Sequence, residues 1–291
     1  MLDLVTAGEA FDDFIFYSLA ALPKAGEEMK TDAFSQTPGG GTIITAVAAA
    51  RLGIRCAIVS GVSAGAARAV RAEGVRVQNL RRDDEPAAIT VALSTTRDRS
   101  FVTFNGVNSR LPARIRPALA RVRARHVHLA FFPAPCRPWI RVVEALRARG
   151  ITTSWDFGWN PALVRDTHFR ALAIAVDYLF MNRDETLLYS RRARIAAAID
   201  RWRDAPHHVV VKLGAAGSRL VGGGDDVRAA APRVRVVDTT GAGDAFNAGF
   251  LAGRLRGDSL RGALQLANRV GALSTRHAGG IAGLPHARDV L

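Results

Sequence analysis

The alternation of short apolar runs with longer helical patterns constrains the fold of this chain most strongly. Runs that look like buried strands occur at residues 2–7, 56–60, 126–132, 151–157, 175–181 and 208–213. Helical segments lie between most of them; residues 42–52, for example, are Ala-rich and are followed by Gly53, a common helix end. Because alternating strands and helices build a parallel sheet covered on both faces, we predict a doubly wound, mainly parallel α/β fold.

Two stretches of the chain break this alternation. Each contains two strand-like runs and no helical pattern, and the charged Arg97-Asp98-Arg99 lies between the runs of the second stretch. We therefore predict two hairpins that together form a small antiparallel β-sheet beside the main domain. The expected division gives residues 1–10, 38–83 and 110–291 to the main domain, and residues 11–37 and 84–109 to the small sheet.

The strongly basic balance raises the question of a nucleic-acid partner. The formal net charge is +14, and only Lys24, Lys30 and Lys212 among the 40 basic residues are lysine. The arginines are scattered through helical stretches such as residues 114–125 and 191–203, without the aromatic platform of single-strand binders. We interpret the charge as a compositional bias on solvated helix faces and expect no specific nucleic-acid partner.

The cysteines and the apolar runs bear on the compartment. Cys56 and Cys136 form no CxxC pair, which favours a reduced, cytoplasmic chain. The first ten residues lack the cationic start of a signal peptide and carry Asp3 and Glu9. No apolar run reaches the ~18–20 residues that cross a bilayer, so we expect no membrane partner.

The segment Asp238-Thr239-Thr240-Gly241-Ala242-Gly243-Asp244-Ala245-Phe246 carries the strongest chemical signal. A helical pattern follows it, so its glycines lie at a helix N-terminus, where unpaired amides and the helix dipole favour an anion such as phosphate. A carboxylate at Asp244 could orient or deprotonate a hydroxyl that accepts a phosphoryl group. The ordinary alternative is a glycine turn that caps a helix, with Asp244 as an N-terminal charge.

This nine-residue string resembles the C-terminal signature of the ribokinase-like (PfkB) family of carbohydrate and nucleoside kinases. Four further segments are similar to motifs of that family: Gly8-Glu9-Ala10-Phe11-Asp12-Asp13, Pro38-Gly39-Gly40-Gly41 with residues 46–53, Met181-Asn182-Arg183-Asp184-Glu185, and Lys212-Leu213-Gly214-Ala215-Ala216-Gly217. The resemblance covers most of the chain. It implies an ATP-dependent carbohydrate kinase with the α/β fold predicted above and with the small sheet acting as a lid.

The resemblance also implies roles for individual residues. Asp244 would be the catalytic base, and the amides around Gly241, Ala242 and Gly243 would stabilise the transferring charge. Substrate would be bound by Asp13, Gly39 and Gly40, with Ile44 in the acceptor pocket, and the nucleotide by Asn182, Lys212, Gly214, Gly217 and Asn268. Glu185 would hold Mg²⁺ through water, and Asp238 and Thr240 would help hold a monovalent cation such as K⁺, with carbonyls from residues 275–280.

Each of these residues also has an ordinary interpretation. Asp13 could be a charge in a loop, Glu185 an acid at a helix N-terminus, and Asn268 a side chain that faces solvent. Their order and spacing around the Asp244 motif favour the functional interpretation. The cofactors expected on this basis are ATP and Mg²⁺, with K⁺ as a further candidate.

Two departures from the family pattern fall in the acceptor pocket. Ile44 stands where sugar kinases of the family usually carry Asn, and the strand Leu129-Ala130-Phe131-Phe132-Pro133 lacks the usual acidic residue. Since an unpaired buried hydroxyl costs ~1–3 kcal/mol, ribose fits poorly, and a less polar sugar or a nucleoside fits better. Trp155, Phe157 and Trp159 could stack on a base or sugar, although core packing is favoured for the first two.

Three kinds of function therefore remain open. The first is a sugar kinase, and the second is a nucleoside kinase with the same machinery. The third is a ligand-binding regulator without catalysis, against which the intact Asp244, Glu185 and glycine loop argue. A homodimer through the small sheet is an additional expectation from the resemblance. The sequence leaves the identity of the acceptor undecided.

Overall fold

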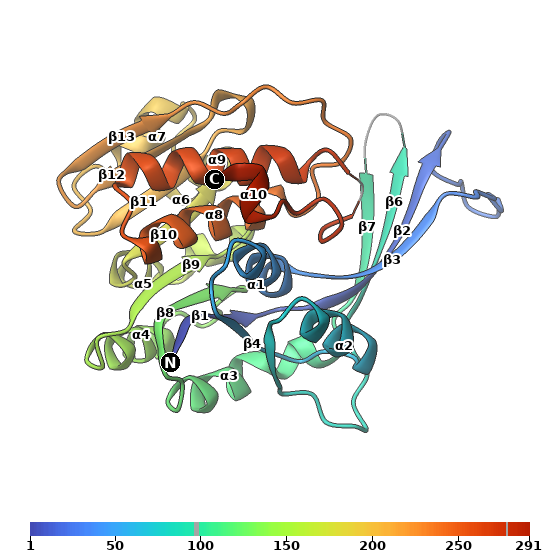
Figure 1. Cartoon of the computed structure of the whole chain (residues 1–291), viewed down its shortest axis with the longest axis horizontal. Helices are drawn as coiled ribbons and strands as arrows, with labels where there is room; N and C mark the ends of the chain where they lie inside the picture. Colours follow the sequence, from blue (N-terminus) through green and yellow to red (C-terminus); the bar gives the residue numbers. More distant parts are fainter. Residues whose placement is uncertain (96–98, 278) are drawn as a thin grey trace.

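The computed structural model describes residues 1–95, 99–277 and 279–291, and within them one large sheet dominates (Figure 1). Its nine strands follow the order β13-β12-β11-β10-β9-β8-β1-β4-β5. All neighbouring strands from β11 to β5 pair in parallel, and β12 and β13 add an antiparallel edge. The strands are β1 (Leu2–Gly8), β4 (Cys56–Ser60), β5 (Arg76–Asn79), β8 (Ala124–Ala130), β9 (Thr152–Asp156), β10 (Tyr178–Asn182), β11 (His208–Lys212), β12 (Ser218–Gly222) and β13 (Asp225–Ala229).

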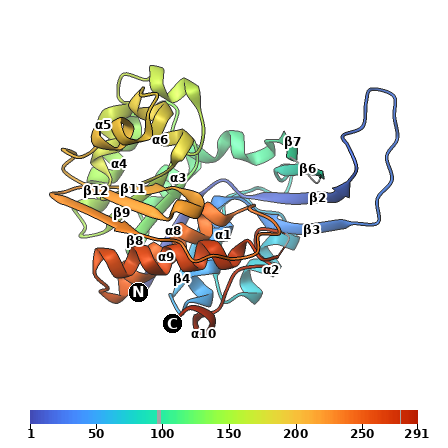
Figure 2. The same cartoon turned by 90° about the horizontal axis from the view of Figure 1, so that it is seen from above.

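Helices cover both faces of this sheet, so the predicted doubly wound fold is confirmed (Figures 1 and 2). One face packs against α1 (Gly41–Arg51), α2 (Ala64–Ala72), α8 (Ala242–Arg256), α9 (Leu260–Ser274) and the short α10 (Ala287–Val290). The other face packs against α3 (Leu111–Leu119), α4 (Arg137–Arg147), α5 (Phe169–Ala175), α6 (Arg183–Ser190) and α7 (Ile195–Asp200). Three 3-10 turns complete the described elements: η1 (Gly106–Arg110), η2 (Pro161–Arg165) and η3 (Gly214–Ala216).

The central strands are apolar on both faces because each face contributes to a separate core. In β4 all five residues are buried, and Ile58 faces one core while Val59 faces the other. This continuous apolar pattern is what a parallel strand between two helical layers requires. The aromatic side chains of Trp139 and Trp155 fill the second core, with ring centroids 5.4 Å apart.

A second sheet of four strands stands to one side of the large sheet (Figure 1). It contains β2 (Phe11–Leu19), β3 (Phe34–Gly39), β6 (Ile89–Thr95) and β7 (Arg99–Phe104) in the order β3-β2-β6-β7. Both predicted hairpins are present, β2 with β3 and β6 with β7. The prediction of a wholly antiparallel sheet was wrong, because β2 and β6 pair in parallel and join the two hairpins at the centre. The predicted turn residues Arg97 and Asp98 lie outside the described residues.

Some element boundaries differ from the sequence-based expectation. Strands β5, β12 and β13 were not predicted; β5 and β13 are short and lie at the two edges of the sheet, where the apolar pattern is weak. The helical stretch expected over residues 114–125 ends at Leu119, because β8 already begins at Ala124. Over residues 191–203 only α7 is helical. The three consecutive glycines that begin at Gly222 form the predicted turn, here between β12 and β13.

The length and composition of the helices bear on membrane insertion. Among the residues that the structure describes, none of the helices combines the length and the apolar composition that a bilayer span requires.

Candidate active site

The candidate site lies where the parallel strands of the large sheet end. Asp156 is the last residue of β9, Asn182 the last of β10 and Lys212 the last of β11. Asn182 and Lys212 are direct partners in the strand register, so these ends lie side by side. In open α/β sheets this carboxyl edge is the usual place for a ligand, because the loops that follow the strands converge there.

A buried ion pair anchors the site. Lys212 Nζ donates to Asp156 Oδ2 at 2.7 Å, and Asn247 Nδ2 from α8 donates to the same oxygen at 2.8 Å. Both charged side chains are only 12% exposed. Burial alone would raise the pKa of Asp156, but the charge and hydrogen bond of Lys212 lower it below its ordinary value. The pair therefore keeps a positive and a negative charge fixed at the sheet edge.

Asp244 lies in the first turn of α8, beside this ion pair. Gly241 caps the helix with a φ of 73°, a left-handed conformation that favours glycine. A Cβ atom at Gly41 would lie 3.0 Å from Asp244 Oδ1, and one at Gly243 would lie 3.1 Å from Lys212 Nζ. Burial, with a smaller effect of the Asp156 carboxylate, raises the pKa of Asp244 to about 7. The helix N-terminus thus holds a carboxyl group that changes its charge near neutral pH.

Asn182 and Glu185 form a reciprocal cap at the start of α6. Glu185 N donates to Asn182 Oδ1 at 2.9 Å, and Asn182 N donates to Glu185 Oε2 at 2.7 Å. The interpretation of Glu185 as an acid at a helix N-terminus is therefore correct as local geometry. Burial, together with the Asp156 charge, raises the pKa of Glu185 to about 7. Glu185 and Asp244 consequently belong to one group of interacting carboxyls around Lys212.

A pocket of about 560 Å³ opens beside the glycine loop. It is lined by four residues predicted to bind nucleotide, Lys212, Gly214, Gly217 and Asn268, and by Ala242 and Gly243 of the loop. Phe246, Val234 and Val236 contribute apolar walls. A mostly apolar cavity of this size with a few convergent polar groups is typical of a small-molecule site. Asn182 lies at the neighbouring strand end and does not line this pocket.

Asn268 projects from α9 into the protein. It is 5% exposed, and its Nδ2 donates to Ser218 Oγ at 2.9 Å and to the Ala229 carbonyl at 3.1 Å. The interpretation of Asn268 as a side chain that faces solvent was therefore wrong. Its hydrogen bonds tie α9 to the start of β12 and the end of β13.

Asp238 and Thr240 organise the segment that leads into the glycine loop. Asp238 Oδ1 accepts from the Thr240 amide at 2.9 Å and from Thr240 Oγ1 at 2.7 Å. Asp238 Oδ2 accepts from the Gly279 amide at 3.0 Å, which draws the chain after α9 toward the same place. The two residues predicted for a monovalent cation are thus adjacent, and the Thr275 carbonyl lies beside them. Ala278 of the predicted carbonyl loop lies outside the described residues.

Asp13 lies against Gly39, close to the start of α1. It lies on β2 of the small sheet, not in a loop, and it is 9% exposed. A Cβ atom at Gly39 would lie 1.8 Å from Asp13 Oδ2, so only glycine permits this close approach. Burial, with the neighbouring Asp12, raises the pKa of Asp13 to about 7. Gly40 caps α1, and the chain from Gly39 to Gly41 thereby runs from the Asp13 carboxyl to the Asp244 carboxyl.

Ile44 lies beneath the glycine loop. Its side chain is 2% exposed, and its Cδ1 atom would be 2.7 Å from a Cβ atom at either Gly241 or Gly280. It therefore supports the loop with apolar contact. Trp155 and Phe157 are buried in the core, as the sequence favoured, whereas Trp159 is 58% exposed.

Sequence reasoning missed Asp156 and Asn247. Asp156 ends the predicted strand that begins at Ile151, a position where a polar residue indicates a site. Asn247 lies three residues after Asp244, on the same face of α8. The strand-end signal could have identified Asp156, but nothing in the sequence pairs it with Lys212, which is 56 residues away.

Comparison with known proteins identifies the family to which this chain belongs. The family described as "pfkB family carbohydrate kinase" matches residues 1–287. The chain is 29% identical to the ribokinase of Bacillus subtilis over 275 residues, which cover 92% of this chain and 91% of that protein. It is 30% identical to a fructokinase of Klebsiella pneumoniae over 280 residues, 88% and 91% of the two chains. The structure of Arabidopsis thaliana ribokinase complexed with ribose and ATP matches the fold with a TM-score of 0.80 at 24% identity, covering 99% of this chain and 97% of that one.

Proposed function

Because the chain belongs to the pfkB family of carbohydrate kinases, we propose that Asp244 is the base that activates a sugar hydroxyl for phosphorylation by ATP. The observation that carries this proposal is the position of Asp244 at the N-terminus of α8, next to Lys212 and the glycine loop. The same helix end that attracts phosphate therefore holds the carboxylate. A phosphate and an acceptor hydroxyl bound there would meet in front of it.

The proposed step is a direct transfer. The ionised Asp244 takes the proton of the acceptor hydroxyl as that oxygen forms a bond to the γ-phosphorus. The bond from the γ-phosphorus to the oxygen it shares with the β-phosphate breaks, and its electrons stay on ADP. The amides of Gly241, Ala242 and Gly243 stabilise the charge on the transferring group. The proton on Asp244 is afterwards released to water.

The raised pKa suits Asp244 to this role. A base works best when its pKa lies near the working pH, and the pKa of Asp244 is about 7. The Lys212 ammonium group lies against Gly243, where it would attract the phosphate chain. The pocket lined by Gly214, Gly217 and Asn268 would take the nucleoside end of ATP.

The donor groups around the phosphate position suit Mg²⁺ held through water. Within the described chain, no three His, Cys, Asp or Glu side chains are placed to hold a metal ion by themselves. Glu185 is a carboxylate at the site, and Mg²⁺ usually keeps several of its waters, so Glu185 would contact it through one of them. The ion would neutralise charge on the phosphate oxygens. Asp238 and Thr240 would form part of a K⁺ site beside the loop.

We propose a small, comparatively apolar sugar as the acceptor, bound by Asp13 and by the backbone at Gly39 and Gly40. Asp13 supplies a buried carboxyl that can bind hydroxyl groups, and Ile44 offers no hydrogen bond below the loop. A nucleoside is the second candidate, because Trp159 exposes a large aromatic face after the end of β9.

The small sheet would close over the acceptor and exclude water, which competes as a phosphoryl acceptor. It carries exposed apolar side chains at Phe34, Phe101, Val102 and Phe104. Phe101, Val102 and Phe104 belong to the edge strand β7, which a second copy would cover in a homodimer. Light scattering should then give a dimer that Phe101→Ser/Phe104→Ser converts to a monomer; a monomeric wild type would rule out this contact.

The cytoplasmic location of the protein stays a prediction.

The first experiment follows ADP release from Mg·ATP with K⁺ against a panel of pentoses, hexoses, deoxy sugars and nucleosides. Release that depends on a sugar supports the main proposal, and release that depends on a nucleoside supports the second. ATP binding without turnover on any acceptor would favour a ligand-binding regulator. The Asp244→Asn variant should abolish release and keep ATP binding; loss of ATP binding in this variant would contradict the base assignment.

A further inference from the structure

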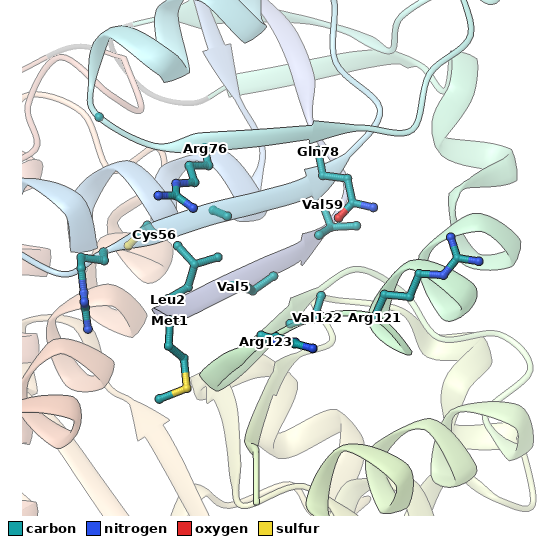
Figure 3. A pocket seen from close by; sticks show the side chains of 13 residues that line it. Met1, Leu2, Val5, Cys56, Val59, Arg76, Gln78, Arg121, Val122 and Arg123 are labelled. Atoms are coloured by element: carbon teal, nitrogen blue, oxygen red, sulfur yellow. The ribbon is translucent and has the colours of Figure 1, made fainter. Parts of the chain in front are cut away.

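A second hollow lies at the opposite end of the large sheet from the proposed active site (Figure 3). Its volume is about 600 Å³. It is bounded by the first half of β1, by β4 and β5, and by residues 121–123 between α3 and β8. Because none of the described residues that line it belongs to the candidate active site, the hollow takes no part in the proposed reaction.

The hollow combines an apolar floor with a basic rim. Val5, Ala57 and Val59 form the floor and are at most 7% exposed. In Figure 3, Arg76 of β5 lies on one side and Arg121 and Arg123 lie on the other. None of the described residues that line the hollow is Asp or Glu. The site therefore offers apolar contact and positive charge together.

Three of the guanidinium groups have no acidic partner. Arg55, also on the rim, is held by Asp3 at 2.7 and 2.9 Å. In the part of the chain that the structure describes, the side chains of Arg76, Arg121 and Arg123 make neither a hydrogen bond nor an ion pair. The three side chains are exposed, whereas arginines that pair with carboxylates, such as Arg114 with Glu85 and Arg219 with Asp226, are more buried. Gathering like charges in one hollow is unfavourable unless an anion neutralises them.

The loop that carries two of these arginines is held in place. The Arg149 guanidinium donates to the carbonyls of Leu119 and Ala120 at 3.2 and 3.1 Å, and also to the Val122 carbonyl. Val122 itself is buried against the core. The backbone under Arg121 and Arg123 is therefore fixed, which lowers the entropy cost of binding a ligand.

The geometry points to a small phosphorylated organic molecule as the ligand of this hollow, with its phosphate at the basic rim and its organic part over the apolar floor. Guanidinium groups bind phosphate oxygens with paired, charge-assisted hydrogen bonds. The volume suits a ligand of metabolite size. A nucleic acid would instead favour a continuous basic stripe with aromatic side chains, and none of the lining residues that the structure describes is aromatic.

The test uses 1-naphthyl phosphate, which carries both chemical features, and 1-naphthol and pyrophosphate, which carry one each. The full-length protein is first saturated with Mg²⁺ and a non-hydrolysable ATP analogue, so that the catalytic anion site is filled. Titration calorimetry should then show saturable binding of one naphthyl phosphate per chain, weaker binding of pyrophosphate and none of naphthol. Raising the salt concentration should weaken the phosphate binding.

Two matched variants locate the site. Arg76→Gln/Arg121→Gln/Arg123→Gln removes the three rim charges, and Arg68→Gln/Arg141→Gln/Arg201→Gln removes three exposed charges elsewhere. The rim variant should bind naphthyl phosphate at least about tenfold more weakly, and the control should bind it as the wild type does. If the rim variant melts early, Arg123→Gln alone gives the same comparison with a smaller loss.

Three results would overturn the proposal. The first is equal binding by the rim variant and the control. The second is no saturable binding of naphthyl phosphate or pyrophosphate to the wild type. The third is salt-dependent binding of a DNA duplex that the rim variant loses while neither small probe binds, which would make the rim a nucleic-acid surface.

Discussion

The two ends of the large sheet carry opposite chemistry. At the carboxyl ends, Asp156, Glu185 and Asp244 surround one buried cation, Lys212. At the amino ends, the hollow gathers arginines over an apolar floor without an acid in its described lining. At one end charges are buried and paired, so removing one affects both stability and chemistry. At the other end they are exposed on the rim, so they can be changed at little cost to folding.

The largest effect is expected at Asp244. Asp244→Asn should lower kcat about 10³-fold because the amide cannot accept the hydroxyl proton, while nucleotide affinity changes little. Asp204→Asn, which changes an exposed acid in the turn after α7, is the matched control and should retain activity. Steady-state kinetics and ATP titration separate the two quantities. A kcat within tenfold of wild type would show that Asp244 is not the catalytic base.

The buried pair should matter next, through stability. Lys212→Met leaves the Asp156 carboxylate buried beside Asn247 without its cation and should lower the free energy of unfolding by about 3 kcal/mol. The exposed pair of Arg203 with Asp226 is the contrast; Arg203→Met should cost about 1 kcal/mol or less. Urea unfolding measures both.

A double-mutant cycle sharpens this contrast. Asp156→Asn/Lys212→Met should recover part of the loss, because no unpaired charge is left behind. Equal and additive losses in the buried and the exposed pair would show that the two kinds of charge do not differ.

A smaller effect is expected in the pH dependence of stability. The pKa of Asp244 is about 7 in the folded chain against an ordinary value of 3.8, so the folded state binds this proton more tightly than the unfolded state. Stability from this group is therefore present at low pH and is lost as the pH rises from about 4 through about 7. Asp244→Asn should be more stable than wild type at pH 8, on the order of 1–2 kcal/mol, and equal to it near pH 4.

Melting curves across this pH range test the prediction. The activity of the wild type should fall below pH 7 as Asp244 becomes protonated. A variant that loses stability at pH 8 would show that the Asp244 carboxylate stabilises the folded chain.

The smallest effect is expected from the rim arginines. Without an added phosphorylated ligand, Arg76→Gln/Arg121→Gln/Arg123→Gln should leave kcat and KM within about twofold of wild type, because exposed charges far from a site act weakly on it. A large loss of kcat in a correctly folded rim variant would show that the two ends of the sheet are functionally coupled.

Much of the fold followed from local patterns. The apolar runs at residues 2–7 and 56–60 became β1 and β4 because a buried parallel strand must be apolar on both faces. The glycine loop before Asp244 became the start of α8 for an equally local reason. Gly241 caps this helix in the left-handed conformation, which glycine adopts more readily than other residues. The short edge strands β5 and β13 escaped prediction because an edge strand needs no continuous apolar run.

The sequence by itself determined the layered α/β architecture and the kinase family and proposed most residues of the candidate site, because each depends on short stretches of chain. Only the tertiary structure decided that Asp156 pairs with Lys212, that β2 joins β6 in parallel, and that the loop after α3 faces β5 across a basic hollow. These are contacts between segments far apart in sequence. They depend on how the layers pack, and no local pattern of residues encodes them.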